Sequence, residues 1–266
     1  MTWGINNLAG PLLAWFWMVA WIGLAPSLRC AGVVLLLVPA VTLVAWNMVE
    51  PVVMRRCAFV SRYLLPGASL ARWLSRHLLL SLWQILKALA LVVVLLVAAP
   101  QWPLWMLALL LADALVASWI YRGVVHLLRG QLKPAVAAVV GRRILVWINT
   151  ALLVGAVVAG ELVSSHPDYR ALGWSGTLEE ALSSVHFGCE LLAPLARAGA
   201  GREAIAWRLM QLGVEGLSNR YLELAAWLLF LAASTLALWA WSRLLAGSLI
   251  DRRGVLSLAG GCRGDE

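Results

Sequence analysis

Two ionisable residues lie inside apolar stretches of the sequence, where a charged side chain is costly and is a candidate functional group. Lys87 follows Leu78, the start of one apolar stretch, and Asp113 precedes Tyr121, the end of the next. At a rise of 1.5 Å per residue, they lie roughly 14 Å and roughly 12 Å from the same end of two successive helices. Residues 100–103 form a tight turn, so we expect an antiparallel hairpin whose two charges lie at nearly one level.

An intramembrane pair of Lys87 and Asp113 has three interpretations. The first is structural: a lone charge at the centre of a membrane helix costs about 2.5–3.5 kcal/mol, and pairing removes much of that cost. The second is a proton- or ion-coupling site, and the third is docking against a partner helix. We favour the structural ion pair. Ser81 and Gln84 precede Lys87 at steps of three, which predicts a polar stripe facing the bundle interior.

The remaining chemistry-bearing residues are sparse. His186 and Cys189 would share one helical face and could ligate a metal ion, but the spacing is not diagnostic and a fourth ligand is unassigned. The sequence has no C-x-x-C pair, Walker A loop, Rossmann fingerprint, H-E-x-x-H or G-x-S-x-G. We therefore predict no metal site, no cofactor, no catalytic residues and no enzymatic activity.

The amino-acid composition indicates whether these residues lie in a soluble protein or in a membrane protein. Of the 266 residues, 62% are hydrophobic and only 13% are charged, and the mean hydropathy is +0.85. Soluble domains are about 45–50% apolar and about 25% charged. These values exclude a soluble enzyme, a disordered chain, a coiled coil and a nucleic-acid-binding domain, so we expect no nucleic-acid partner. The sequence predicts a polytopic integral membrane protein.

A spanning helix needs about 20 apolar residues, and six stretches qualify. The predicted fold is an all-α bundle of six transmembrane helices with a small periplasmic helical subdomain. Residues 1–165 hold five spans, 166–220 the periplasmic segment, and 221–266 the sixth span and a tail. The predicted spans are 8–25, 31–49, 78–99, 104–121, 144–163 and 221–242.

The distribution of basic residues predicts the orientation. Basic side chains gather between the second and third spans, between the fourth and fifth, and after the sixth, whereas the first loop has one arginine and the third has none. By the positive-inside rule, both termini are cytoplasmic. The near-exclusive use of arginine over lysine, with much Ala, Leu, Val and Gly, suggests a GC-rich bacterial genome and an inner-membrane location.

One cytoplasmic loop has the pattern of an interfacial helix. Arg122, His126, Arg129 and Lys133 follow one another at i, i+4, i+7 and i+11, which places them on one helical face. We expect this helix to lie flat on the cytoplasmic leaflet with its basic face toward anionic lipid. Docking of an acidic cytoplasmic protein is the alternative.

The fifth predicted span carries small residues at steps of four: Ala151, Gly155 and Ala159. Such a stripe lets another helix approach closely. We favour packing inside the bundle over association of two chains. Asn149, one turn into the same span, is expected to form a hydrogen bond across a helix interface.

The periplasmic segment is the part most like a soluble fold. Thr177 and Glu180 have the spacing of a capping box, so a helix is expected to begin there and to stop near Pro194 or before residues 199–201. A second helix is expected over 202–214. Each helix has an apolar stripe, which we interpret as a docking surface for a partner, with packing on the membrane domain or of the two helices on each other as the alternatives. The stripes are Leu178, Leu182 and Val185, and Ile205, Leu209 and Leu212.

These patterns together favour a non-catalytic inner-membrane subunit. It would anchor or organise other membrane or periplasmic proteins, as in secretion, conjugation or a similar envelope machine. The alternative is a transporter or channel component that uses Lys87 and Asp113. Cys30 and Cys189 are both predicted to lie outside, where disulfides can form, and their pairing is left open. Trp241 is expected in the aromatic belt of the inner interface.

Overall fold

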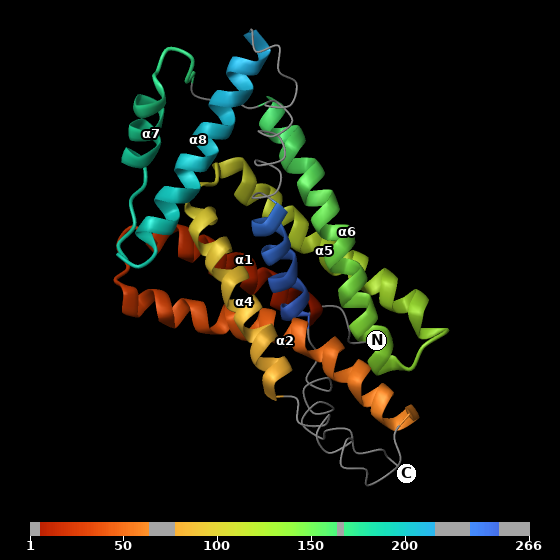
Figure 1. The fold of residues 1–266 in the computed structure, drawn as a ribbon. Coiled ribbons are helices and arrows are strands. Elements are labelled where there is room, and N and C mark those ends of the chain that lie inside the picture. The colour runs from red at the N-terminus through yellow and green to blue at the C-terminus, as the bar shows by residue number, and fades with distance from the viewer. Residues whose placement is uncertain (1–5, 64–77, 164–167, 216–234, 250–266) are drawn as a thin grey trace.

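The computed structural model describes residues 6–63, 78–163, 168–215 and 235–249, which form helices and no β-strand (Figure 1). Residues 235–248 are also helical and are called the central helix below. The other helices are α1 (Asn6–Leu24), α2 (Cys30–Tyr63), α4 (Leu78–Ala98), α5 (Leu104–Arg129), α6 (Pro134–Val163), α7 (Trp174–Ser183) and α8 (Ala193–Glu215). A short 3-10 turn, η1 (Ala99–Gln101), joins α4 to α5, so the predicted tight turn is confirmed.

Four of these helices are long and apolar enough to cross a membrane. They are parts of α2, α4, α5 and α6, over Cys30–Phe59, Leu79–Gln101, Leu104–Arg129 and Val136–Glu161. The apolar part of α1, Leu8–Leu24, is shorter. The predicted span 221–242 lies mostly outside the described residues. The helical membrane-protein class is therefore supported, while the count of six spans stays a prediction.

The central helix occupies the middle of the bundle. Most of its residues are buried, including Leu238, Trp241 and Leu245. On one side Gly10 of α1 touches the backbone of Ser248, and on another a Cβ on Gly247 would lie 2.5 Å from the carbonyl oxygen of Leu43. Glycine is required at both contacts because the helix backbones approach closely.

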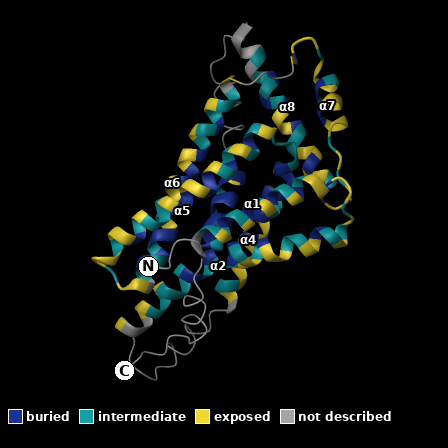
Figure 2. Cartoon of the chain, turned by 180° about the vertical axis from the view of Figure 1, so that it is seen from behind, coloured by how far each residue is buried: buried dark blue, intermediate teal, exposed yellow. Residues whose placement is uncertain are grey.

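The outer helices pack in neighbouring pairs around this centre. α4 packs against α2, α6 packs against α5, and α5 also packs against α1. Figure 2 shows buried residues along the inner faces of these helices and exposed residues along their outer faces. Many large exposed side chains are apolar, among them Leu35, Leu79, Leu104 and Leu152. An apolar exterior suits helices surrounded by lipid rather than water.

Three helices extend beyond their predicted ends. α2 continues to Tyr63, α5 continues to Arg129, and α6 begins at Pro134 instead of 144, so the connection between α5 and α6 is only residues 130–133. The prediction of a separate, flat basic helix is therefore wrong: Arg122, His126 and Arg129 continue the axis of α5, and Lys133 lies in the turn. No strong helix breaker occurs between Tyr121 and Gly130, and basic side chains near a helix C-terminus are favourable.

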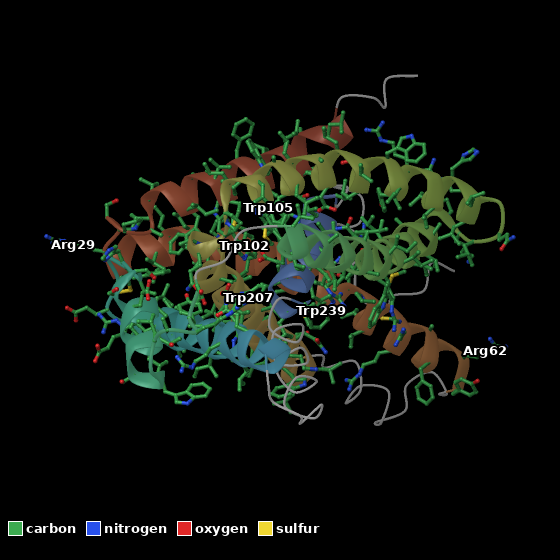
Figure 3. All side chains as sticks on the ribbon, turned by 90° about the horizontal axis from the view of Figure 1, so that it is seen from above. Arg29, Arg62, Trp102, Trp105, Trp207 and Trp239 are labelled. Carbon is green, nitrogen blue, oxygen red and sulfur yellow. A yellow bond between two sulfur atoms is a disulfide. The ribbon has the colours of Figure 1, made fainter. Side chains whose placement is uncertain are left out.

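The helices α7 and α8 lie at one end of the bundle, away from the α5–α6 turn and the C-terminal end of α2 (Figure 1). The opposite end holds the α5–α6 turn and the last turns of α2, and we call it the basic end. Figure 3 shows Arg29 and Arg62 far apart, near opposite ends of α2. α7 and α8 pack against each other through Ala181 and Ala204, and Tyr169, which precedes α7, belongs to the same buried cluster.

The predicted capping box is wrong. α7 begins one turn earlier, with Gly173 at its N-cap, and Thr177 lies inside the helix, where its hydroxyl donates to the carbonyl of Gly173. α7 also ends at Ser183, so His186 and Cys189 lie in the connection to α8 and not on a helix.

A disulfide ties the α7–α8 connection to the bundle. Cys30, the first residue of α2, is bonded to Cys189, which is buried. Beside it, the amide of Gly188 donates to the carbonyl of Ala25, and no Cβ fits at Gly188 because carbonyl oxygens of the 26–28 turn lie too close. The pairing left open above is thus resolved in the structure, and Cys189 is not available as a metal ligand.

Candidate functional site

Asp113 of α5 is the centre of a buried polar cluster in the bundle. The indole Nε1 of Trp241 donates to Asp113 Oδ2 at 2.8 Å, and Asn149 Nδ2 donates to the same oxygen at 3.2 Å. Asn149 Nδ2 also lies 3.1 Å from the hydroxyl of Ser242. The cluster therefore joins α5, α6 and the central helix. The prediction that Asn149 bonds across a helix interface is confirmed, while Trp241 is a core residue and not part of the aromatic belt.

Lys87 and Asp113 do not form the predicted ion pair. Asp113 is 8% exposed and bonded as described, whereas Lys87 is exposed on α4 with its Nζ 5.1 Å from the centre of the Trp83 ring. The reason is that α4 packs against α2, while α5 packs against α1 and α6 and meets the central helix through Trp241. The transporter interpretation required these two residues to act together, and the structure separates them.

The predicted polar stripe on α4 turns away from the interior along its length. Ser81 and Gln84 are half-buried, and Lys87 is exposed. A step of three residues falls short of a full helical turn by about 60°, so Lys87 is rotated by about 120° from Ser81. The stripe thus begins against neighbouring helices and ends facing the surroundings of the bundle.

A buried ion pair lies nearer the basic end. Arg142 Nη2 of α6 donates to Glu50 Oε2 of α2. Both residues are buried, with 3% of Arg142 and 4% of Glu50 exposed. Beside it, Arg243 Nη1 of the central helix donates to Asn47 Oδ1 at 2.9 Å. Sequence reasoning missed this pair because both residues lie just outside the predicted spans 31–49 and 144–163. The available signal was Glu50 itself, an acid at the end of a span where nearby charges are basic.

The α7–α8 pair is held together by a buried arginine. Arg208 Nη1 donates to the hydroxyl of Thr177 at 2.8 Å and to the carbonyl of Tyr169 at 3.1 Å, and its guanidinium lies 4.7 Å from the Trp174 ring centre. The proposed docking stripes are only partly available. Leu182 is exposed, and the side chain of Leu212 lies outside the described residues. The other four residues of the stripes are half-buried: Leu178, Val185, Ile205 and Leu209.

The small-residue stripe on α6 is not part of the internal packing. Ala151, Gly155 and Ala159 are exposed, and a Cβ on Gly155 would meet nothing within 4 Å. The close approach occurs instead at Gly160, against the ring of Trp105. The expectation that the stripe packs inside the bundle is therefore wrong, and these three residues face outward.

The ionisable residues of the bundle described above are of two kinds. Asp113, Glu50 and Arg142 have hydrogen-bond partners inside the bundle, while Lys87 faces outward. Among the described residues, no group of three His, Cys, Asp or Glu side chains is placed to hold a metal ion. No protein-family model, curated protein or solved structure matches this chain.

Proposed function

We propose that the protein is a non-catalytic membrane subunit that anchors or organises other proteins, and that α4 is its lateral contact in the membrane. The observation that carries the proposal is the outward-facing Lys87. It lies near the middle of α4, a helix long and apolar enough to span a membrane. Its exposed neighbours on the helix surface, Trp83 and Leu86, are large and apolar.

Within the described part of the chain Lys87 forms no ion pair, and we infer that its charge is met by a partner outside the bundle. At the centre of a membrane helix, an unpaired Lys costs about 2.5–3.5 kcal/mol on the insertion scale. The buried acids Asp113 and Glu50 are already bonded to Trp241 and Arg142. A carboxylate on a transmembrane helix of another protein would neutralise Lys87, and the apolar surface around it would pack against that helix.

The two ends of the bundle suit an anchoring role on both sides of a membrane. In the proposed orientation the α7–α8 end lies in the periplasm, an oxidising compartment in which the disulfide between Cys30 and Cys189 can form. The arginines of the opposite end support a cytoplasmic location for it. This orientation, with both termini inside a bacterial inner membrane, is part of the proposal.

The orientation is tested by labelling with a membrane-impermeant maleimide in intact cells. A cysteine introduced at Ser175, which is exposed on α7, is expected to react, and one introduced at Gly130 in the α5–α6 turn is expected not to react. Labelling at 130 without labelling at 175 would invert the proposed topology. The unaltered chain is the control for its native cysteines.

The partner contact is tested by replacing Lys87 with Met, Arg or Glu. Native gels of membranes solubilised in mild detergent are expected to show a complex that is lost with Lys87→Met and Lys87→Glu and kept with Lys87→Arg. Lys133→Met is the matched control, because Lys133 is the other lysine and lies exposed in the α5–α6 turn. A photo-crosslinker at Leu86 should reach the partner in the unaltered chain.

Protein stability separates this contact from an internal role of Lys87. The purified Lys87→Met variant is expected to melt at the same temperature as the unaltered chain or higher, since a lipid-facing charge has been removed. If the complex persists in Lys87→Met, or if the purified variant alone melts markedly lower, Lys87 is not a partner contact.

A further inference from the structure

A cavity of about 180 Å³ lies where α2, α4, α6 and the central helix converge toward the basic end. Its polar lining includes Asn47 and Arg55 of α2, Gln84 of α4, Arg142 and Arg143 of α6, and Arg243 of the central helix. At roughly 30 Å³ per water molecule, the cavity holds a compact polar group together with water. Neither the ion pair nor the lateral contact on α4 accounts for it.

The charge of the lining is strongly positive. Four arginines line the cavity, and Glu50 is the acid among its lining residues. Glu50 is bonded to Arg142, which leaves the charges of Arg55, Arg143 and Arg243 unneutralised by a lining residue. Such a concentration of one sign of charge in a recess between helices attracts an anion.

The arginines differ in how firmly they are held. Arg243 is fixed by its hydrogen bond to Asn47 and by the Trp239 ring, whose centre lies 5.2 Å from the guanidinium carbon. Arg55 and Arg143 are exposed, so their guanidinium groups can reach a bound group without loss of the buried ion pair. One preorganised and two adjustable guanidinium groups match an oxyanion with several acceptor oxygens.

The location of the cavity points to a phosphate-type oxyanion. Trp147, which is 62% exposed, also lines it, and tryptophan on the outside of a membrane helix favours the headgroup level. We infer that this cavity binds a phosphate group through Arg55, Arg143 and Arg243. The group comes either from the headgroup of an anionic lipid in the surrounding leaflet or from free phosphate. This site does not depend on any partner protein.

The test uses the purified full-length chain in a non-ionic detergent and follows its thermal unfolding. One arm titrates phosphatidylglycerol, with phosphatidylcholine as the uncharged reference, and a second arm titrates inorganic phosphate against chloride at equal ionic strength. A group that binds the folded state raises the melting temperature in proportion to its occupancy. Stabilisation by phosphatidylglycerol alone identifies a lipid headgroup, and stabilisation by both identifies a site that also takes free phosphate.

Matched variants assign the binding to the cavity. Arg55→Gln with Arg143→Gln is expected to raise the half-saturating concentration about tenfold or more, because two charge-assisted contacts are lost. Arg62→Gln with Arg129→Gln removes the same charge from exposed positions that do not line the cavity, and it is expected to leave that concentration nearly unchanged. Both variants should melt like the unaltered chain without ligand. Equal weakening in the two variants, or no stabilisation of the unaltered chain in either arm, would overturn the inference.

Discussion

Buried acidic side chains in this bundle meet their partners on other helices. Glu50 of α2 meets Arg142 of α6, and Asp113 of α5 meets Trp241 of the central helix and Asn149 of α6. In a low-dielectric interior, each of these contacts is strong while both partners are present. Removal of one partner leaves the other buried and unpaired, which lowers the free energy of unfolding. Each acid therefore specifies which helices lie side by side.

The ion pair of Glu50 and Arg142 gives the first prediction. Glu50→Gln or Arg142→Gln alone is expected to lower the free energy of unfolding by about 3–5 kcal/mol, because the remaining charge stays buried without its partner. Glu50→Leu combined with Arg142→Met is expected to recover much of this loss. Unfolding of the purified variants in detergent measures both effects. A double variant as unstable as the sum of the two single changes would contradict the pairing.

Double-mutant cycles distinguish the two proposed partners of Asp113. Trp241→Phe is expected to destabilise the protein by about 1.5–3 kcal/mol, since a hydrogen bond to a charged group is lost. In an Asp113→Leu background, the same change should cost clearly less. Lys87→Met is expected to have the same effect in both backgrounds, because it is not in contact with Asp113. Coupling of Asp113 to Lys87 and not to Trp241 would restore the hairpin ion pair.

The apolar helices could be predicted from sequence because a run of about 20 apolar residues is itself the signal. Their ends could not, since hydropathy falls at Tyr121 while nothing in the backbone stops α5 before Gly130. The partner of Asp113 was also out of reach. This partner, Trp241, lies on the central helix, more than a hundred residues later in the chain. No local sequence pattern indicates that this helix packs beside α5.

The close packing of the central helix is tested with two glycines. Gly247→Ala is expected to lower stability by about 1–3 kcal/mol, because the new Cβ would lie 2.5 Å from the carbonyl oxygen of Leu43 and the helices must separate. Gly155→Ala is the matched control on the outer face of α6, where a Cβ meets nothing within 4 Å. It is expected to be neutral or stabilising by up to about 1 kcal/mol. Equal melting temperatures for the two variants would contradict the central position of residues 235–248.

At the scale of the whole molecule, two ends with different chemistry are joined through one apolar bundle. The α7–α8 end is attached by the disulfide between Cys30 and Cys189, by the bond from Gly188 to Ala25, and by Gln101, whose Nε2 donates to Ala196 at 3.3 Å. The basic end carries the arginine-lined cavity. The disulfide-bonded end and the arginine-lined end are therefore chemically distinct parts of one fold.

The disulfide makes the attachment of the α7–α8 end sensitive to reduction. Cys30→Ser with Cys189→Ser is expected to reduce stability by about 2–5 kcal/mol and to speed trypsin cleavage at Arg197, which is exposed on α8. Gel analysis of the fragments over time measures the cleavage. Reducing agent should speed cleavage of the unaltered chain but not of the double variant. Identical digestion of both proteins under oxidising conditions would show that the bond does not restrain this end.

The central helix follows every other described helix in the chain, yet it lies in the middle of the bundle. During synthesis, the four helices that are long and apolar enough to cross a membrane, α2, α4, α5 and α6, are made before the residues of the central helix. Until Trp241 and Ser242 emerge from the ribosome, Asp113 and Asn149 lack these partners in the lipid phase. The core of the bundle is therefore completed last, by the residues of the chain that are made after all the helices around them.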